Sequence, residues 1–319
     1  MRSAFGCIAA AAICLLAIPS PVHAQQFPAR NIRVIVGPGP DIIPRLFAPK
    51  LTEVLRQQVI VEPRPGAGGV IAAQSVANAP PDGYLLLQAT ASYTINTALQ
   101  SSAYDMRKDF APVTLVSTIP FVLVVHPSVP AKTLSELIGY AKANPGKLNY
   151  ASSGIGTPPH LAGELFKTMA GIDIVHVPFR EANSALNSVI SGATQMSFVI
   201  ASIAQSQMSG GTVRGLAVTS KQPSPLVPGI PPVAQAGLPG FEVIGWNGFV
   251  APKGTPEPVI AKLSGALLAG LGDAELRKRV TTAGYEPAEK NSPSQFAAFI
   301  AADTSKWLDL VAKTNMKAN

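Results

Sequence analysis

The chain contains little cysteine and little charge, and each scarcity excludes a class of protein. Its two cysteines, Cys7 and Cys14, both lie near the N-terminus, so the rest of the chain can form no disulfide and supply no thiolate. Charged residues make up 13% of the 319 positions, and the net charge of +7 is scattered rather than gathered in a basic stripe with aromatic residues. We therefore expect no nucleic-acid partner.

Motifs of common enzyme sites are missing as well. There is no Walker phosphate loop and no Gly-x-Ser-x-Gly nucleophile elbow, and two glycine-rich stretches fail the dinucleotide fingerprint at its last position. His126, His160 and His176 lack the spacing of metal ligands. We predict a protein that uses no cofactor and no metal and is not an enzyme. An exported enzyme acting on an organic acid stays an alternative, because catalytic groups converge in space rather than in sequence.

The N-terminus has the pattern of a secretory signal peptide. Arg2 provides the positive start, residues 4–18 form an apolar run, and residues 22–24 read as a small-x-small cleavage site. The run is too short to span a bilayer as an ordinary helix, which argues against a retained anchor. We predict cleavage after Ala24, so that residues 1–24 are removed, and a periplasmic location.

Strand-like and helix-like segments alternate along the remaining chain. Short β-branched runs predict strands, and longer segments with helical spacing predict helices. Such alternation is typical of parallel sheets covered by helices. The first predicted strands are residues 32–36, 59–62 and 84–88, the first predicted helices are residues 42–55 and 69–78, and a second alternating set begins at residue 133.

Two apolar segments, residues 113–126 and 240–251, interrupt this alternation and suit crossings between lobes. We predict an α/β fold with residues 25–124 and 246–319 in lobe 1, residues 125–245 in lobe 2, and two crossover strands as the hinge. Ligands of open α/β sheets bind at the carboxyl ends of strands, so two facing lobes form a cleft. Two rigidly packed domains with no ligand between them are the alternative.

Four loops rich in glycine or hydroxyl groups follow predicted strands: residues 37–41, 66–69, 90–92 and 152–157. Three of them open a predicted helix, and Asp41 is predicted to be the N-cap of the helix that follows. Unpaired N–H groups at helix starts favour carboxylates or phosphates. Glycine in any one loop is more simply a turn residue, but the recurrence at strand ends predicts a cradle for an anion.

Candidate ligand-binding residues come from these loops and from the segment after residue 178. Arg180 is the candidate for charge pairing, with a solvated surface arginine as the alternative. His160 is predicted to be a structural helix residue, and Trp246 to pack at the hinge. The candidates are Pro38, Gly39, Asp41, Ala67, Gly68, Thr90, Ser92, Ser152, Ser153, Gly154, Gly156, Thr157, Phe179 and Arg180.

The order of motifs resembles the substrate-binding proteins of tripartite tricarboxylate transporters, the Bug or TctC-like family. The resemblance covers essentially the whole chain after the signal. It implies a Venus-flytrap periplasmic-binding-protein fold, type II-like, that binds small carboxylates, often dicarboxylates, and has membrane transporter subunits as partners. We expect a monomer. The matching stretches are residues 27–33, 63–69, 79–84, 108–113, 150–156, 176–179, 215–220 and 246–252.

The chain departs from the family pattern mainly in its first loop. Members read roughly Pro-x-x-Pro-Gly-Gly-x-x-Asp after the first strand, whereas residues 37–41 are shorter and lack one glycine of the pair. Pro63 stands where asparagine is usual, and Glu181 follows Arg180 where glycine is usual. A relative that has lost binding is therefore one alternative. A ligand sensor that presents its closed form to a membrane sensor kinase is another.

Overall fold

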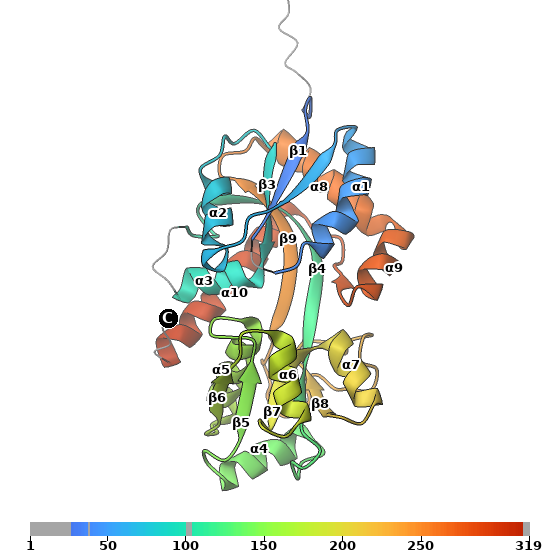
Figure 1. Cartoon of the computed structure of the whole chain (residues 1–319). Coiled ribbons are helices and arrows are strands. Elements are labelled where there is room, and N and C mark those ends of the chain that lie inside the picture. Colours follow the sequence, from blue (N-terminus) through green and yellow to red (C-terminus); the bar gives the residue numbers. More distant parts are fainter. Residues whose placement is uncertain (1–26, 38, 100–103, 315–319) are drawn as a thin grey trace, which may run out of the picture.

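The computed structural model describes residues 27–37, 39–99 and 104–314. Figure 1 shows two α/β lobes stacked end to end, with long strands running through the waist between them. The predicted signal peptide and Pro38 lie outside the described residues. Within them, no helix is long and apolar enough to cross a membrane.

The first lobe is a mixed sheet covered on both faces by helices. Strands β1, β2 and β3 are parallel, and β9 runs antiparallel between β3 and β4. Helices α1, α8 and α9 share one buried apolar cluster, and α2, α3 and α10 belong to another. The elements are β1 (Ile32–Val36), α1 (Ile42–Leu55), β2 (Val59–Pro63), a 3₁₀ turn (Ala67–Gly69), α2 (Val70–Ala77), β3 (Leu85–Thr90), α3 (Ala91–Leu99), β4 (Phe110–Val125), β9 (Ile244–Pro252), α8 (Glu257–Gly272), α9 (Ala274–Thr282), β10 (Glu286–Pro287) and α10 (Pro293–Thr314).

The second lobe is built on the far half of β4. Strands β5, β6 and β7 pair in parallel, and β4 pairs antiparallel with β7 and β8. Helices α6 and α7 lie on one face of this sheet, and α4 and α5 on the other. The elements are α4 (Leu134–Ala143), β5 (Asn149–Ser152), α5 (Pro158–Ala170), β6 (Val175–Pro178), α6 (Ala182–Ile190), β7 (Met196–Ile200), α7 (Ala201–Ser209) and β8 (Arg214–Val218).

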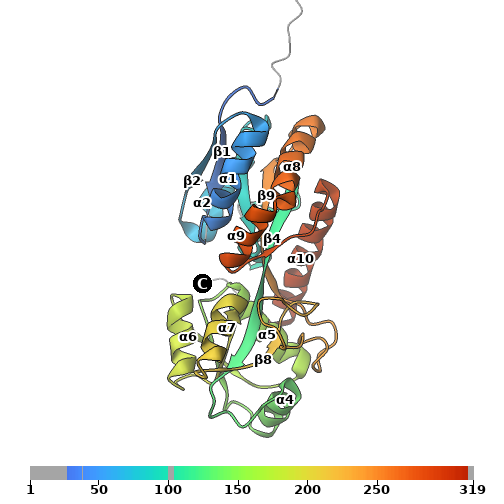
Figure 2. The same ribbon diagram turned by 90° about the vertical axis from the view of Figure 1, so that its right-hand side faces the viewer.

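Strand β4 connects the two lobes and exchanges partners at the waist. It pairs with β9 as far as Pro120 and with β7 from Phe121 onward. Proline has no N–H, so the ladder loses a donor where the exchange occurs. The chain returns to the first lobe through β9. Just before β9 begins, the Val243 N–H donates to the Thr219 carbonyl at 3.1 Å. Figure 2 shows β4 passing from one lobe to the other. The residue limits of the lobes stay a prediction.

Most predicted elements match the structure, and the helix expected at residues 42–55 is α1. Asp41 stands at the predicted N-cap position of that helix, but its side chain makes no capping bond. Asp41 has φ −88° and ψ 18° and caps no N–H, because its Oδ2 instead accepts from Arg45 Nε at 2.7 Å, one turn into the helix. The surface ion pair competes successfully for the side chain that a cap would need.

The predicted loop at residues 90–92 is also wrong. Thr90 ends β3, and α3 begins at once with Ala91. The hydroxyl-rich sequence did not indicate a helix, because serine and threonine side chains compete for backbone groups and are neutral to unfavourable inside helices. Within a helix, however, their hydroxyls can donate to a carbonyl of the preceding turn. They do so here: Thr94 Oγ1 donates to the Ala91 carbonyl at 2.9 Å, and Thr97 Oγ1 to the Tyr93 carbonyl at 3.0 Å.

Candidate functional site

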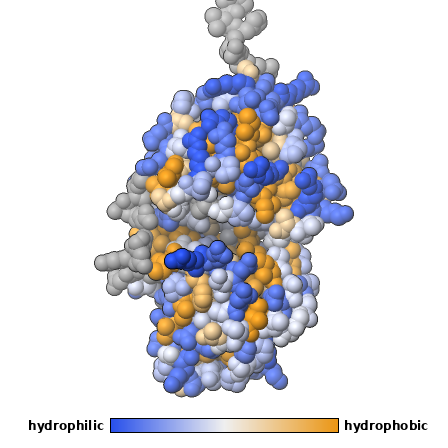
Figure 3. Space-filling model, in the orientation of Figure 1, coloured by the Kyte–Doolittle hydropathy of each residue, from blue (hydrophilic) through white to orange (hydrophobic). Residues whose placement is uncertain are grey.

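A cavity in two adjoining parts lies where the lobes meet. The part in the second lobe has a volume of about 200 Å³, and the part against the first lobe about 140 Å³. Phe121, Pro158 and Ile200 line both parts and so join them. The space-filling view shows apolar atoms on both sides of the waist (Figure 3). No charged side chain among the described residues lines either part.

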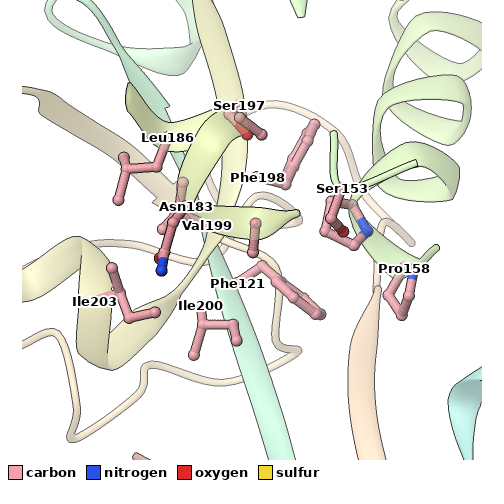
Figure 4. Close-up of a pocket in the computed structure, with 13 residues that line it drawn as sticks. Phe121, Ser153, Pro158, Asn183, Leu186, Ser197, Phe198, Val199, Ile200 and Ile203 are labelled. Atoms are coloured by element: carbon pink, nitrogen blue, oxygen red, sulfur yellow. The ribbon is translucent and has the colours of Figure 1, made fainter. Parts of the chain in front are cut away.

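The loop at residues 152–157 reaches this cavity from the second lobe. Ser153 lines it, and Figure 4 shows Ser153 and Pro158 facing Leu186, Asn183 and Ile203 across the space. Gly154 and Gly156 have φ values of 120° and 76°, in the region that favours glycine. The Ser153 and Ile155 N–H groups have no acceptor within the described chain. The loop therefore offers main-chain donors to a ligand.

Ser152 holds this loop in place from inside the protein. It is fully buried, and its Oγ lies 2.7 Å from His176 Nε2. The same oxygen accepts from the Gly154 N–H at 3.2 Å. Ser152 was a candidate ligand contact, but its hydroxyl is used within the fold, so it positions the loop.

Two stacked histidines continue this support. The ring centroids of His160 and His176 are 4.2 Å apart, and His176 also stacks on Tyr150 at 4.7 Å. His160 Nδ1 accepts from the Gly156 N–H at 3.2 Å. Burial lowers the pKa of His160, and burial together with nearby His160 lowers the pKa of His176 to about 4. Both rings are therefore neutral near pH 7, so His160 Nδ1 carries no proton and can accept the hydrogen bond from the Gly156 N–H.

The start of α5 provides fewer donors than the sequence led us to expect. Pro158 and Pro159 occupy the first helical positions and have no N–H. Thr157 uses its own N–H, which donates to the Gly154 carbonyl at 3.3 Å. The donors that remain for an anion at this end of the cavity are therefore mainly the Ser153 and Ile155 N–H groups.

The first lobe lines its part of the cavity with Gly39 and with the junction of β3 and α3. Thr90 and Ser92 lie at this junction, and Thr90 Oγ1 is buried without a partner among the described residues. The first N–H groups of a helix have no intrahelical acceptor and carry partial positive charge. The junction therefore faces the cavity with an unpaired hydroxyl and unpaired amides.

Several candidate residues lie away from the cavity. Asp41, Ala67 and Gly68 do not line it, and the Gly68 carbonyl instead accepts from Asn96 Nδ2 at 2.8 Å. Phe179 packs on the apolar cluster beneath α6. Arg180 is exposed and has no carboxylate partner within the described part of the chain.

The structure also adds lining residues that the sequence did not single out as ligand contacts. Phe121, Leu186, Phe198 and Ile203 come from four separate elements, β4, α6, β7 and α7. On the first-lobe side, Asn247 lines the cavity; its Oδ1 accepts from Gln88 Nε2 at 2.9 Å, and its Nδ2 donates to Ser117 Oγ at 3.0 Å. The local sequence around an apolar residue does not show whether its side chain faces the core or a cavity.

Trp246 lines the same part but is fully buried. Its Nε1 donates to Asp303 Oδ2 at 3.0 Å, and its ring packs edge-on against Phe296 and Phe299. Asp303 also accepts from Thr94 Oγ1 and pairs with Lys306. This packing agrees with the predicted structural role of Trp246.

Comparison with known proteins identifies the family. Residues 43–316 match the model of the tripartite tricarboxylate transporter family receptor. The chain belongs to this family. It is 31% identical to Protein BugT of Bordetella pertussis over 307 residues, which cover 94% of each protein. The family and the two-lobed α/β fold predicted from the sequence are thus confirmed.

Solved structures give the same result. A structure of Rpa4515 of R. palustris with adipate is 30% identical, covers 90% of this chain and 97% of its own, and has a TM-score of 0.75. MatC of Rhodopseudomonas palustris with bound malate is 33% identical and has a TM-score of 0.73. The match covers 89% of this chain and 100% of the MatC chain. The chain is a solute-binding protein of the periplasmic-receptor type.

Proposed function

We propose that this receptor captures a small organic anion, a carboxylate, in the cavity between its lobes and delivers it to a tripartite tricarboxylate-type transporter. The observation that carries the proposal is the meeting of unpaired donors from both lobes at one cavity: the Ser153 and Ile155 N–H groups and the start of α3 with Thr90. The adipate and malate bound to the two R. palustris proteins support a carboxylate.

Neutral donors are enough to hold such an anion. A carboxylate that accepts several N–H bonds is stabilised in its charged form without a cationic partner. Gly39, Thr90, Ser92 and Ser153 line the cavity and are the proposed contacts. The other candidates stay predictions from the sequence: Pro38, Asp41, Ala67, Gly68, Ser152, Gly154, Gly156, Thr157, Phe179 and Arg180.

Closure follows from the position of the donors. A ligand favours the closed state when it contacts both lobes there and one lobe in the open state. We propose that the exported chain, cleaved after Ala24, works in this way as a monomer. Transporter subunits recognise its closed form, whereas delivery to a sensor kinase is the competing partner assignment.

Calorimetry on the purified protein tests the binding proposal. We expect at least one small carboxylate to bind, and Ser153→Ala with Gly154→Pro to weaken its binding more than about tenfold, which equals roughly 1.4 kcal/mol. Ser209→Ala, at an exposed position on the last turn of α7, is the matched control and should leave affinity unchanged. Unchanged affinity in the double variant would refute the loop assignment, and small-angle scattering without compaction on binding would refute closure.

A further inference from the structure

The second-lobe part of the cavity is lined mainly by apolar side chains. Phe121, Leu186, Phe198, Val199 and Ile203 form most of its wall. Ser197 is also present, but its Oγ already donates to the Ala151 carbonyl at 2.9 Å. This wall therefore provides little to hydrogen-bond a second charged group.

The free polar side chains lie toward the outside. Ser153 is half-buried and Asn183 is exposed, and neither has a side-chain partner within the described residues. Figure 4 shows these two residues on opposite sides of the cavity. A ligand in this part thus has polar contacts at the solvent-exposed rim and apolar contacts along its buried body.

The size of this part matches a six-membered ring. Its volume is about 200 Å³. An apolar cavity of about 150 Å³ lined by leucine, isoleucine and phenylalanine stays dry and binds benzene. A ring therefore fits this part and leaves its carboxylate near the donors of the loop and of α3.

We infer that the ligand is a carboxylate whose apolar body has the size of a six-membered ring, with the ring in the second-lobe part of the cavity. The inference rests on the proposed carboxylate-binding function and specifies its substrate class. Apolar surface of the ring and of the cavity wall is removed from water on binding, which stabilises the complex. A hydroxyl or a second carboxylate on a short dicarboxylate would lose its hydration against these side chains without gaining a partner.

The first test compares four acids by calorimetry on the purified protein after removal of co-purified ligand. Benzoate and cyclohexanecarboxylate are the ring probes, and malate and succinate are the polar probes. We expect at least one ring acid to bind at least about tenfold more tightly than either dicarboxylate, a difference of about 1.4 kcal/mol. Dicarboxylates that bind equally or more tightly would overturn this inference and leave the proposed function standing. No binding by any of the four would overturn both.

A matched pair of variants locates the ring. Ile203→Asn places an amide in the apolar wall, whereas Ile71→Asn makes the same change at a side chain that is 52% exposed on α2 and does not line the cavity. Ile203→Asn should weaken ring-acid binding more than tenfold, and Ile71→Asn should not change it. Equal affinities in both variants, with melting temperatures like that of the unmodified protein, would overturn the placement.

Discussion

The two lobes contribute loops of very different construction to the same cavity. The second-lobe loop, residues 152–157, is held from behind by Ser152 and the stacked rings of His160 and His176. On the first-lobe side, Gly39 and Pro40 are exposed, and the next residue, Asp41, makes a surface pair with Arg45. This difference predicts that the second-lobe loop keeps a fixed geometry when a ligand binds, whereas the exposed first-lobe loop is less constrained.

The largest expected effect comes from breaking the packing behind the second-lobe loop. A Cβ at Gly163 on α5 would lie 2.2 Å from the Tyr150 ring, which stacks on His176. Gly163→Leu should lower the free energy of unfolding by about 3 kcal/mol or more, because an overpacked core forces side chains and backbone to shift. Gly139→Leu on α4, where no atom lies within 4 Å of the added Cβ, is the control. Equal denaturation midpoints for the two variants would contradict the role of this packing.

Removing the Ser152 hydroxyl tests the support of the loop more directly. Ser152→Ala leaves His176 Nε2 and the Gly154 N–H without their shared partner. An unpaired buried polar group costs about 1–3 kcal/mol, so both stability and carboxylate affinity should fall. Chemical denaturation and calorimetry measure the two effects. Ser209→Ala should change neither, and a Ser152→Ala protein with unchanged affinity would show that the loop keeps its geometry without this hydroxyl.

Acidification should weaken the same support to a smaller extent. Burial holds the pKa of His160 below its usual value and that of His176 near 4; Lys167 also lowers the pKa of His176, while Glu164 opposes the shift at His160. The unfolded chain binds these protons more readily than the folded chain, so stability falls as pH decreases from about 6.5 towards 4. Protonation of His160 Nδ1 also removes the acceptor of the Gly156 N–H.

Thermal unfolding followed across this pH range checks the effect. The double variant His160→Gln, His176→Gln should lose the part of the pH slope that the stack contributes. His126→Gln changes a histidine outside the stack and should keep that slope. A double variant with the slope of the unmodified protein would show that other groups cause the acid sensitivity.

The contrast between the lobes also explains how much could be predicted from sequence. Local periodicity located α1 and the long strand β4, and glycine with hydroxyl residues located the loop at residues 152–157. The stack of His160 on His176 could not be predicted, because α5 and β6 meet only through the folded sheet. The apolar wall that includes Phe121 and Ile203 was missed for the same reason. The N-cap position of Asp41 was predicted correctly, but its side chain accepts from Arg45 one turn away rather than from a backbone N–H, which the capping rule does not foresee.

The smallest effect is expected at Asp41, whose side chain makes no capping bond. Asp41 pairs with Arg45 through a 2.7 Å contact, and both side chains are partly exposed, at 29% and 58%. Exposed pairs one helical turn apart stabilise a protein by only about 0.3–0.5 kcal/mol, and Asp41 caps no N–H. Asp41→Ala should therefore change the free energy of unfolding by less than about 0.5 kcal/mol and leave carboxylate affinity unchanged, because the residue does not line the cavity. A loss of affinity greater than tenfold would instead mean that ligand binding depends on the geometry of the short first loop as strongly as on that of the second-lobe loop. The contrast between the two lobes would then fail.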